Sequence, residues 1–144
     1  MRGAVESLRE WVFAYGTLKP GLRYADVAIK AGLSKTYSAT LSRFDLYHLE
    51  PEGYPAIVPG DGTVTGVVLE IKESGLALLD VLEGVDLSPP EYRRERHKVH
   101  GFSAEVWVYV YHRADRLNRQ GAVLIPSGLW PPDTYETKVN NSTD

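Results

Sequence analysis

The segment from residue 104 to residue 112 constrains the fold most, because it is apolar or aromatic on both of its faces. Valines alternate there with aromatic residues, in the order Val106, Trp107, Val108, Tyr109, Val110 and Tyr111. Successive side chains of a strand point to opposite faces. The segment therefore predicts a strand with core on one face and a helix, a loop or a ligand on the other. Residues 92–99 predict an antiparallel neighbour, joined to it through residues 100–103.

Further strands are predicted by apolar or β-branched runs that end at glycine or proline. They cover residues 11–15, one or two strands within residues 37–49, residues 56–58 and residues 63–71. The residues Pro59-Gly60-Asp61-Gly62 predict a turn between the last two runs. Gly66, in the middle of the final run, predicts a bulge or a bend.

One main helix is expected at about residues 75–83, where leucines recur at helical spacing. Ser74 is placed to cap its start and Gly84 to end it. A shorter helix is expected from Tyr24 to Ala31. Strands outnumber helices and no linker divides the chain. We therefore expect one α+β domain over residues 1–144, a small mixed and mostly antiparallel β-barrel with one main helix, with a polar C-terminal tail from about residue 131.

Charge and composition exclude several kinds of site. A formal net charge of -3 argues against a nucleic-acid-binding surface, and the basic cluster at residues 93–96 is short and interrupted by Glu95. The chain has no cysteine, which removes disulfides, thiolate nucleophiles and cysteine-based zinc sites. Its 4 histidines lack the spacing of a metal pair, so we expect no metal.

The start of the chain does not resemble a secretory signal. Glu6, Arg9 and Glu10 interrupt the apolar stretch that such a signal requires, and no later apolar run approaches the roughly 20 residues of a membrane span. A cytoplasmic protein without a membrane partner is the expectation. The sequence leaves the oligomeric state open.

A candidate ligand site follows the first predicted strand, at Tyr15-Gly16-Thr17-Leu18. Successive N–H groups of such a turn can point the same way and bind an anion, for which a carboxylate is well suited. Gly16 lets a ligand approach the backbone closely because it has no side chain. A strand that ends in Gly-Thr is more often a purely structural turn, so this motif alone does not establish a site.

A candidate acid/base is Glu83, in the last turn of the main helix. The negative end of the helix dipole disfavours a carboxylate there, and shielding from water would raise its pKa, which suits a group that exchanges protons near neutral pH. Asp80 lies one turn earlier on the same face, where it would tune or orient Glu83. The pattern alone is more typical of two solvated surface acids.

Four segments in order resemble one family. They are residues 13–21, residues 53–56, residues 79–84 and Tyr92-Arg93-Arg94. Over about residues 12–111 the chain resembles the gamma-glutamylcyclotransferase-like (AIG2-like) family, and most closely its gamma-glutamylamine cyclotransferase branch. The resemblance implies a mixed barrel with a pocket at one end, where the Tyr15–Leu18 loop holds the γ-glutamyl part of a small-molecule substrate and Glu83 is the catalytic acid/base.

The reaction that the resemblance implies converts a γ-glutamyl amine, or a related γ-glutamyl compound, to 5-oxoproline and a free amine, without a cofactor. A loop N–H group or the Tyr92 hydroxyl would stabilise the oxyanion. The longer Tyr-Gly-Ser-Asn-Leu form of the loop is absent, which makes γ-glutamyl amino acids less expected as substrates. Residues 88–91 offer no obvious specificity residue, so the leaving amine stays open.

Two other functions compete with this one. The first is a non-catalytic domain that binds a small carboxylate in the same pocket, because a shared fold does not secure an activity. The second is a protein-interaction module that presents the strand from Trp107 to Tyr111 as an edge. It requires that strand to be accessible.

Overall fold

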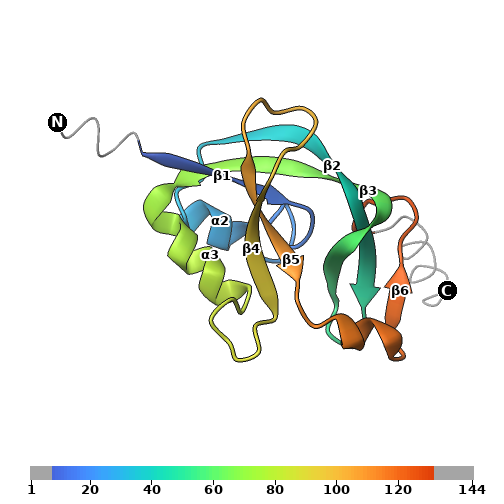
Figure 1. The fold of residues 1–144 in the computed structure, drawn as a ribbon. Helices are drawn as coiled ribbons and strands as arrows, with labels where there is room; N and C mark the ends of the chain where they lie inside the picture. Colours follow the sequence, from blue (N-terminus) through green and yellow to red (C-terminus); the bar gives the residue numbers. More distant parts are fainter. Residues whose placement is uncertain (1–7, 132–144) are drawn as a thin grey trace, which may run out of the picture.

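A curled sheet of six strands forms the body of the molecule (Figure 1). We describe residues 8–131 of a computed structural model. The strands are β1 (Arg9–Ala14), β2 (Lys35–Leu49), β3 (Tyr54–Lys72), β4 (Tyr92–His97), β5 (Val106–Tyr111) and β6 (Ala122–Leu124). The helices are α2 (Ala25–Lys30) and α3 (Leu76–Leu82), with 3₁₀ turns at Glu73–Gly75 and Ala114–Asn118.

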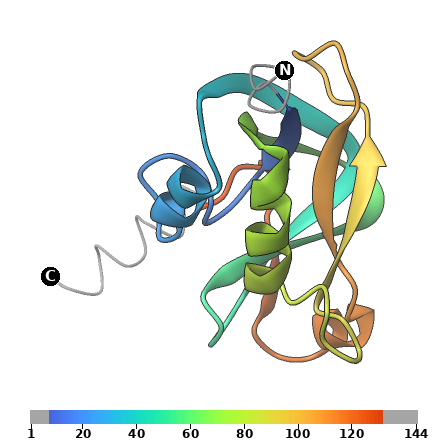
Figure 2. The same cartoon turned by 90° about the vertical axis from the view of Figure 1, so that its left-hand side faces the viewer.

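The strand order is β4-β5-β1-β3-β2-β6. Strands β1 and β5 run parallel, and the other neighbouring pairs are antiparallel. The sheet curls into a half-barrel, with α3 beside β4 and β5 (Figure 2). The predicted α+β class, with a mixed and mostly antiparallel sheet and one main helix, is confirmed. No helix within residues 8–131 is long and apolar enough to cross a membrane.

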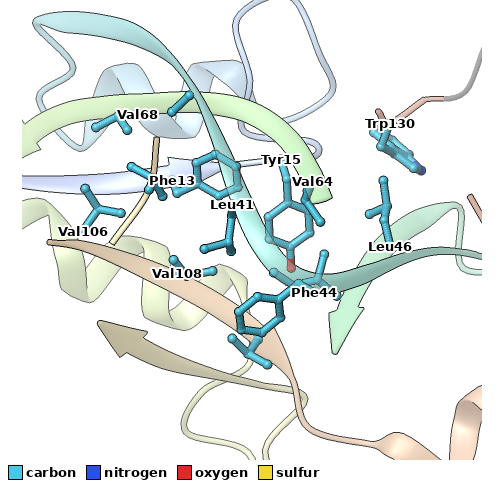
Figure 3. Packing of buried hydrophobic residues seen from close by; sticks show 14 of the residues in the cluster. Phe13, Tyr15, Leu41, Phe44, Leu46, Val64, Val68, Val106, Val108 and Trp130 are labelled. Carbon is cyan, nitrogen blue, oxygen red and sulfur yellow. The ribbon is translucent and has the colours of Figure 1, made fainter. Parts of the chain in front are cut away.

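Strand β5 is buried on both faces, as its alternating sequence predicts. Its valines join a core cluster with Phe13 and Leu41 (Figure 3). On the other face, Tyr109 and Tyr111 belong to a second cluster that includes Leu79 of α3. Because β5 lies between β4 and β1 in the sheet, it is not an edge, and the interaction-module hypothesis is wrong.

The turn predicted at residues 59–62 is instead a bulge inside the continuous strand β3. The pairing of β2 with β3 shifts register between Ser42 and Phe44. The Asp45 carboxylate fills the space beside this bulge and accepts a 3.0 Å hydrogen bond from the Gly62 N–H. A Cβ atom at Gly60 would lie 2.1 Å from Asp45 Oδ2, so these glycines make room for Asp45 rather than reverse the chain.

Of the bulge or bend predicted at Gly66, the bulge is wrong, because Gly66 pairs regularly with Ala39 of β2. The reason for a glycine lies on β1 instead. A Cβ atom there would lie 2.4 Å from the main-chain oxygen of Ala14 and 2.9 Å from Phe13 Cζ. The glycine therefore permits close approach of β1 to β3.

Replacing Gly66 with alanine is expected to lower the free energy of unfolding by about 1 to 3 kcal/mol, because the methyl group has no space beside Ala14. Urea denaturation measures the change. The matched control is Thr65→Ala at the exposed neighbouring position, which should change the free energy by less than about 0.5 kcal/mol. A Gly66→Ala protein that unfolds at the parental urea concentration would contradict the packing argument.

Both predicted helices are present. The α3 helix is preceded by a 3₁₀ turn and followed by Gly84, whose φ of 69° is the left-handed conformation expected of a helix-ending glycine. Ser74 is not its N-cap, because Ser74 lies inside the 3₁₀ turn and Gly75 occupies the cap position of α3. The tail predicted from about residue 131 lies outside the described residues from residue 132 on.

Candidate functional site

A pocket of about 110 Å³ opens between the end of β1, the start of β3 and the end of α3. Every residue predicted for the site lines it, namely Tyr15, Gly16, Thr17, Leu18, Glu83 and Tyr92. The fold therefore joins the two candidate motifs, which are far apart in the sequence. This placement meets the geometric condition for the predicted roles, and the roles themselves stay predictions.

The loop after β1 offers main-chain donors to the pocket. Gly16, Thr17 and Leu18 are buried, and within residues 8–131 their N–H groups donate to no protein acceptor. Their carbonyls are partly used, since Lys19 N–H donates to Gly16 O at 3.0 Å and Tyr24 N–H donates to Thr17 O at 2.8 Å. Buried N–H groups are nearly always paired in proteins, so three unpaired donors in sequence indicate a binding position for an anion.

Position 16 needs a glycine because the opposite wall of the pocket leaves no space for a side chain. A Cβ atom at this position would lie 2.4 Å from Cγ of Pro55. The glycine therefore lets the loop pack directly on the start of β3, which fixes the direction of the free donors.

Glu83 caps the C-terminus of α3, and its N–H donates to Leu79 O at 2.9 Å. Glu83 is partly buried and lines the pocket. Burial is the main cause that raises the pKa of Glu83 to about 8, followed by the charges of Glu91 and Asp80. No group in the described part of the chain donates a hydrogen bond to its carboxyl, so the carboxyl is available to a ligand.

Asp80 is anchored one turn before Glu83. It accepts a hydrogen bond of 2.8 Å from the Tyr109 hydroxyl and an ion pair of 3.0 Å from Arg94 Nε. The explanation of Asp80 and Glu83 as two solvated surface acids is therefore wrong. Asp80 contributes negative charge near Glu83 and fixes Tyr109 in the pocket wall.

Two tyrosine hydroxyls form hydrogen bonds that connect the walls of the pocket. Tyr15 donates to Tyr109 O at 2.6 Å, and Tyr92 donates to Pro55 O at 2.6 Å. The ring of Tyr15 packs in the core (Figure 3). A phenol has one hydrogen to donate. Because Tyr92 uses it on Pro55, the loop N–H groups are the better candidates for the oxyanion donor.

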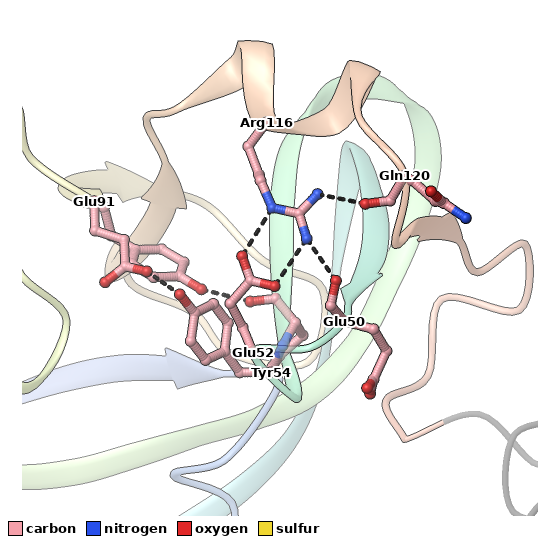
Figure 4. Close-up of polar contacts among 8 residues, drawn as sticks. Glu50, Glu52, Tyr54, Glu91, Arg116 and Gln120 are labelled. Atoms are coloured by element: carbon pink, nitrogen blue, oxygen red, sulfur yellow. Dashed lines mark hydrogen bonds and ion pairs between the residues drawn. The ribbon is translucent and has the colours of Figure 1, made fainter.

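Sequence reasoning missed Tyr54 and Glu91, which also line the pocket. The Tyr54 hydroxyl donates to Glu91 Oε2 (Figure 4). Burial, and then Glu91, raise the pKa of Tyr54. The segment of residues 53–56, which carries part of the family resemblance, could have indicated Tyr54. Nothing in residues 88–91 distinguishes Glu91 from a solvated acid, although the structure places it in the pocket wall.

A partly buried ion pair lies next to Tyr54 in the chain. Arg116 donates from Nε and Nη2 to the carboxylate of Glu52, at 2.8 Å each, and from Nη2 to Glu50 O at 2.7 Å (Figure 4). The fork of Arg116 thus fixes the turn that leads into Tyr54. Among residues 8–131, no group of three or more His, Asp or Glu side chains is arranged to hold a metal ion.

Comparison with known proteins identifies relatives along nearly the whole chain. The family model described as gamma-glutamyl cyclotransferase, AIG2-like, matches residues 12–132. The gamma-glutamylcyclotransferase family protein ytfP of Citrobacter rodentium is 36% identical over 119 residues, which cover 83% of this chain and 93% of the relative. The protein of that name from Escherichia coli K12 is 35% identical over 83% of this chain and 94% of its own length.

Solved structures agree with these matches. The solution structure of ytfP from Escherichia coli has a TM-score of 0.62 at 31% identity, and the match covers 84% of this chain and 96% of that one. A crystal structure of an AIG2-like protein from Mus musculus also has a TM-score of 0.62, at 24% identity over 85% of this chain and 94% of that one, which shows a shared fold. The chain belongs to the gamma-glutamyl cyclotransferase, AIG2-like family.

Proposed function

We propose that the protein is an intramolecular cyclotransferase that converts a γ-glutamyl amine, or a related γ-glutamyl compound, to 5-oxoproline and the free amine. One observation carries the proposal. Within residues 8–131, three unpaired main-chain donors at Gly16–Leu18 and the carboxyl of Glu83, to which no group donates a hydrogen bond, line the same pocket. The first group suits a negatively charged oxygen and the second suits proton transfer.

The charge of the pocket is consistent with such a substrate. Among the described residues that line it, Glu83 and Glu91 are acidic and none is a lysine or an arginine. A carboxylate of the γ-glutamyl group would therefore depend on the loop N–H groups, whereas its α-ammonium would be attracted to the two acids. The Tyr92 ring contributes to the wall, and its hydroxyl keeps Pro55 in place.

The reaction requires little machinery, because nucleophile and electrophile belong to one molecule. The α-nitrogen attacks the γ-carbonyl carbon, a C–N bond closes the ring, and the amide C–N bond breaks. Glu83 takes a proton from the α-nitrogen and returns one to the departing nitrogen, so that no water or cofactor is consumed. Holding the chain folded supplies an effective molarity of about 10⁵ M or more.

The test is an assay of 5-oxoproline and of free amine after incubation with γ-glutamylamines and γ-glutamyl dipeptides. We expect both products in equal amounts, with γ-glutamylamines preferred. Binding of these compounds without product would favour the non-catalytic carboxylate-binding domain. Free glutamate in place of 5-oxoproline would indicate hydrolysis and contradict ring closure.

Replacing Gly16 with alanine is expected to lower kcat/KM by about tenfold to a hundredfold, because the new methyl group must displace Pro55 or the loop, and with it the donors. Steady-state assays of 5-oxoproline formation measure this. The matched control is Gly21→Ala in the same loop. A Cβ atom there meets nothing within 4 Å, and the φ of 83° adds local strain only. Equal losses in the two variants would contradict a specific role for Gly16.

A further inference from the structure

Glu91 transfers no proton in the scheme above, yet it is fixed in the pocket wall. We propose that Glu91 is a positioning residue that acts through Glu83, keeping Glu83 protonated while the pocket is empty and letting it ionise when a cationic amine enters. The consequence for catalysis rests on the proposed function. The effect on Glu83 in the empty pocket does not.

Three contacts hold Glu91 beside the end of α3. Its N–H donates to Gly84 O at 3.0 Å, its carbonyl accepts the His112 N–H at 2.8 Å, and its carboxyl accepts the Tyr54 hydroxyl. Gly84 directly follows Glu83, and a Cβ atom at Gly84 would lie 3.3 Å from Glu91 Oε1. The carboxyl of Glu91 is thus fixed next to the residue that carries the proposed acid/base.

Of the two acids near Glu83, Asp80 has a cationic partner and, within residues 8–131, Glu91 has none. The titratable and charged groups that face Glu83, or pair with those that do, are Asp80, Glu91, Arg94, Tyr15, Tyr92 and Tyr109. Arg94 pairs with Asp80 and offsets its charge. In residues 8–131 no lysine or arginine forms an ion pair with Glu91, whose hydrogen-bond partner is the neutral hydroxyl of Tyr54.

Two carboxyl groups in one pocket cannot both ionise without mutual repulsion, so the less solvated group holds its proton. We assign the proton to Glu83, because burial is the main cause that raises its pKa. An ammonium group that enters the pocket adds a positive charge and offsets the repulsion. Glu83 then releases its own proton to the solvent and becomes a base only when the group to be deprotonated is beside it.

The experiment is a ¹³C NMR titration of the Glu83 carboxyl in the ligand-free full chain, with the resonance assigned by its loss in Glu83→Gln. We expect Glu91→Gln to lower the titration midpoint of Glu83 by about one pH unit. Glu91→Asp keeps the charge and should stay close to the parent. Glu73→Gln, an exposed acid at the other end of α3, should leave the midpoint unchanged. A Glu91→Gln midpoint equal to the parental one, or an equal fall in Glu91→Asp, would overturn the proposal.

Kinetics provide a second measurement when the chain forms 5-oxoproline. The ascending limb of the kcat/KM profile against pH should move to lower pH in Glu91→Gln by the same amount as the NMR midpoint. A limb that stays in place while the midpoint moves would overturn the catalytic part. A chain without any turnover would contradict the proposed function, while the titration would still decide the role of Glu91.

Discussion

Replacement of Glu83 by glutamine is expected to lower kcat/KM for 5-oxoproline formation by about 10²- to 10⁴-fold, the range that a positioned acid/base typically contributes. Glutamine has nearly the shape of glutamate but does not exchange a proton. The main-chain donors at Gly16–Leu18 are untouched by the change, so ligand affinity should stay within several-fold of the parent. Steady-state assays and calorimetric titration with the same γ-glutamylamine measure the two quantities.

The two measurements together separate catalysis from binding. Activity of Glu83→Gln close to the parental value would show that Glu83 is not the proton-transfer group. A loss of affinity as large as the loss of activity would show that the substitution damages the pocket. Glu73→Gln is the control for a change of net charge, since Glu73 lies exposed at the start of the 3₁₀ turn before α3.

The pH dependence of the parental reaction follows from the same group. Glu83 must be ionised to accept the proton of the α-ammonium, and its pKa is raised to about 8 by burial and by nearby acids. Below that pH the free enzyme holds its proton, so kcat/KM should rise as the pH increases toward about 8. A profile that is flat from pH 5 to 8 would contradict this assignment.

Local sequence signals predicted the parts of the fold that depend on short-range patterning. Strand β5 alternates valine with aromatic residues, so that both of its faces must be buried. In the structure one face packs in the core and the other packs in the cluster that includes Leu79 of α3. The leucine spacing and Gly84 located α3 to within a residue or two. The turn at Tyr15–Leu18 and Glu83 at the end of α3 are also marked by local sequence patterns. Each could therefore be predicted as a candidate from the sequence, without knowledge of the pocket that they share.

The sequence-based predictions were wrong or incomplete where contacts between distant parts of the chain determine the local structure. Gly60 and Gly62 look like a turn, but the side chain of Asp45 on the neighbouring strand makes them a bulge. A glycine is needed at position 66 because the main chain of Ala14, on another strand, leaves no space for a side chain. No local sequence pattern indicates this contact. Glu91 is one acid among many in the sequence, and only the folding of its loop back onto Gly84 brings it to the pocket.

Glu83 should also destabilise the protein at alkaline pH. Its pKa is raised from its ordinary value of 4.5 to about 8 in the folded state. Between these two pH values the folded chain holds a proton that the unfolded chain has lost, so stability falls as pH rises. The stabilising contribution of protonated Glu83 is fully present below about pH 4.5 and is lost as the pH rises through about 8.

Glu83→Gln removes this dependence, because glutamine does not ionise. The variant and the parent should unfold with similar free energies at pH 4.5, and by pH 8 to 9 the variant should be more stable by about 4 kcal/mol. Urea denaturation at a series of pH values measures the difference, in which the other titrating groups largely cancel. A difference that does not change with pH would contradict the buried position of Glu83. If the difference grows as expected, one substitution will have raised stability while lowering activity. The shielding that raises the pKa of Glu83, and so suits it to the proposed proton transfer, also makes its charge costly to the fold.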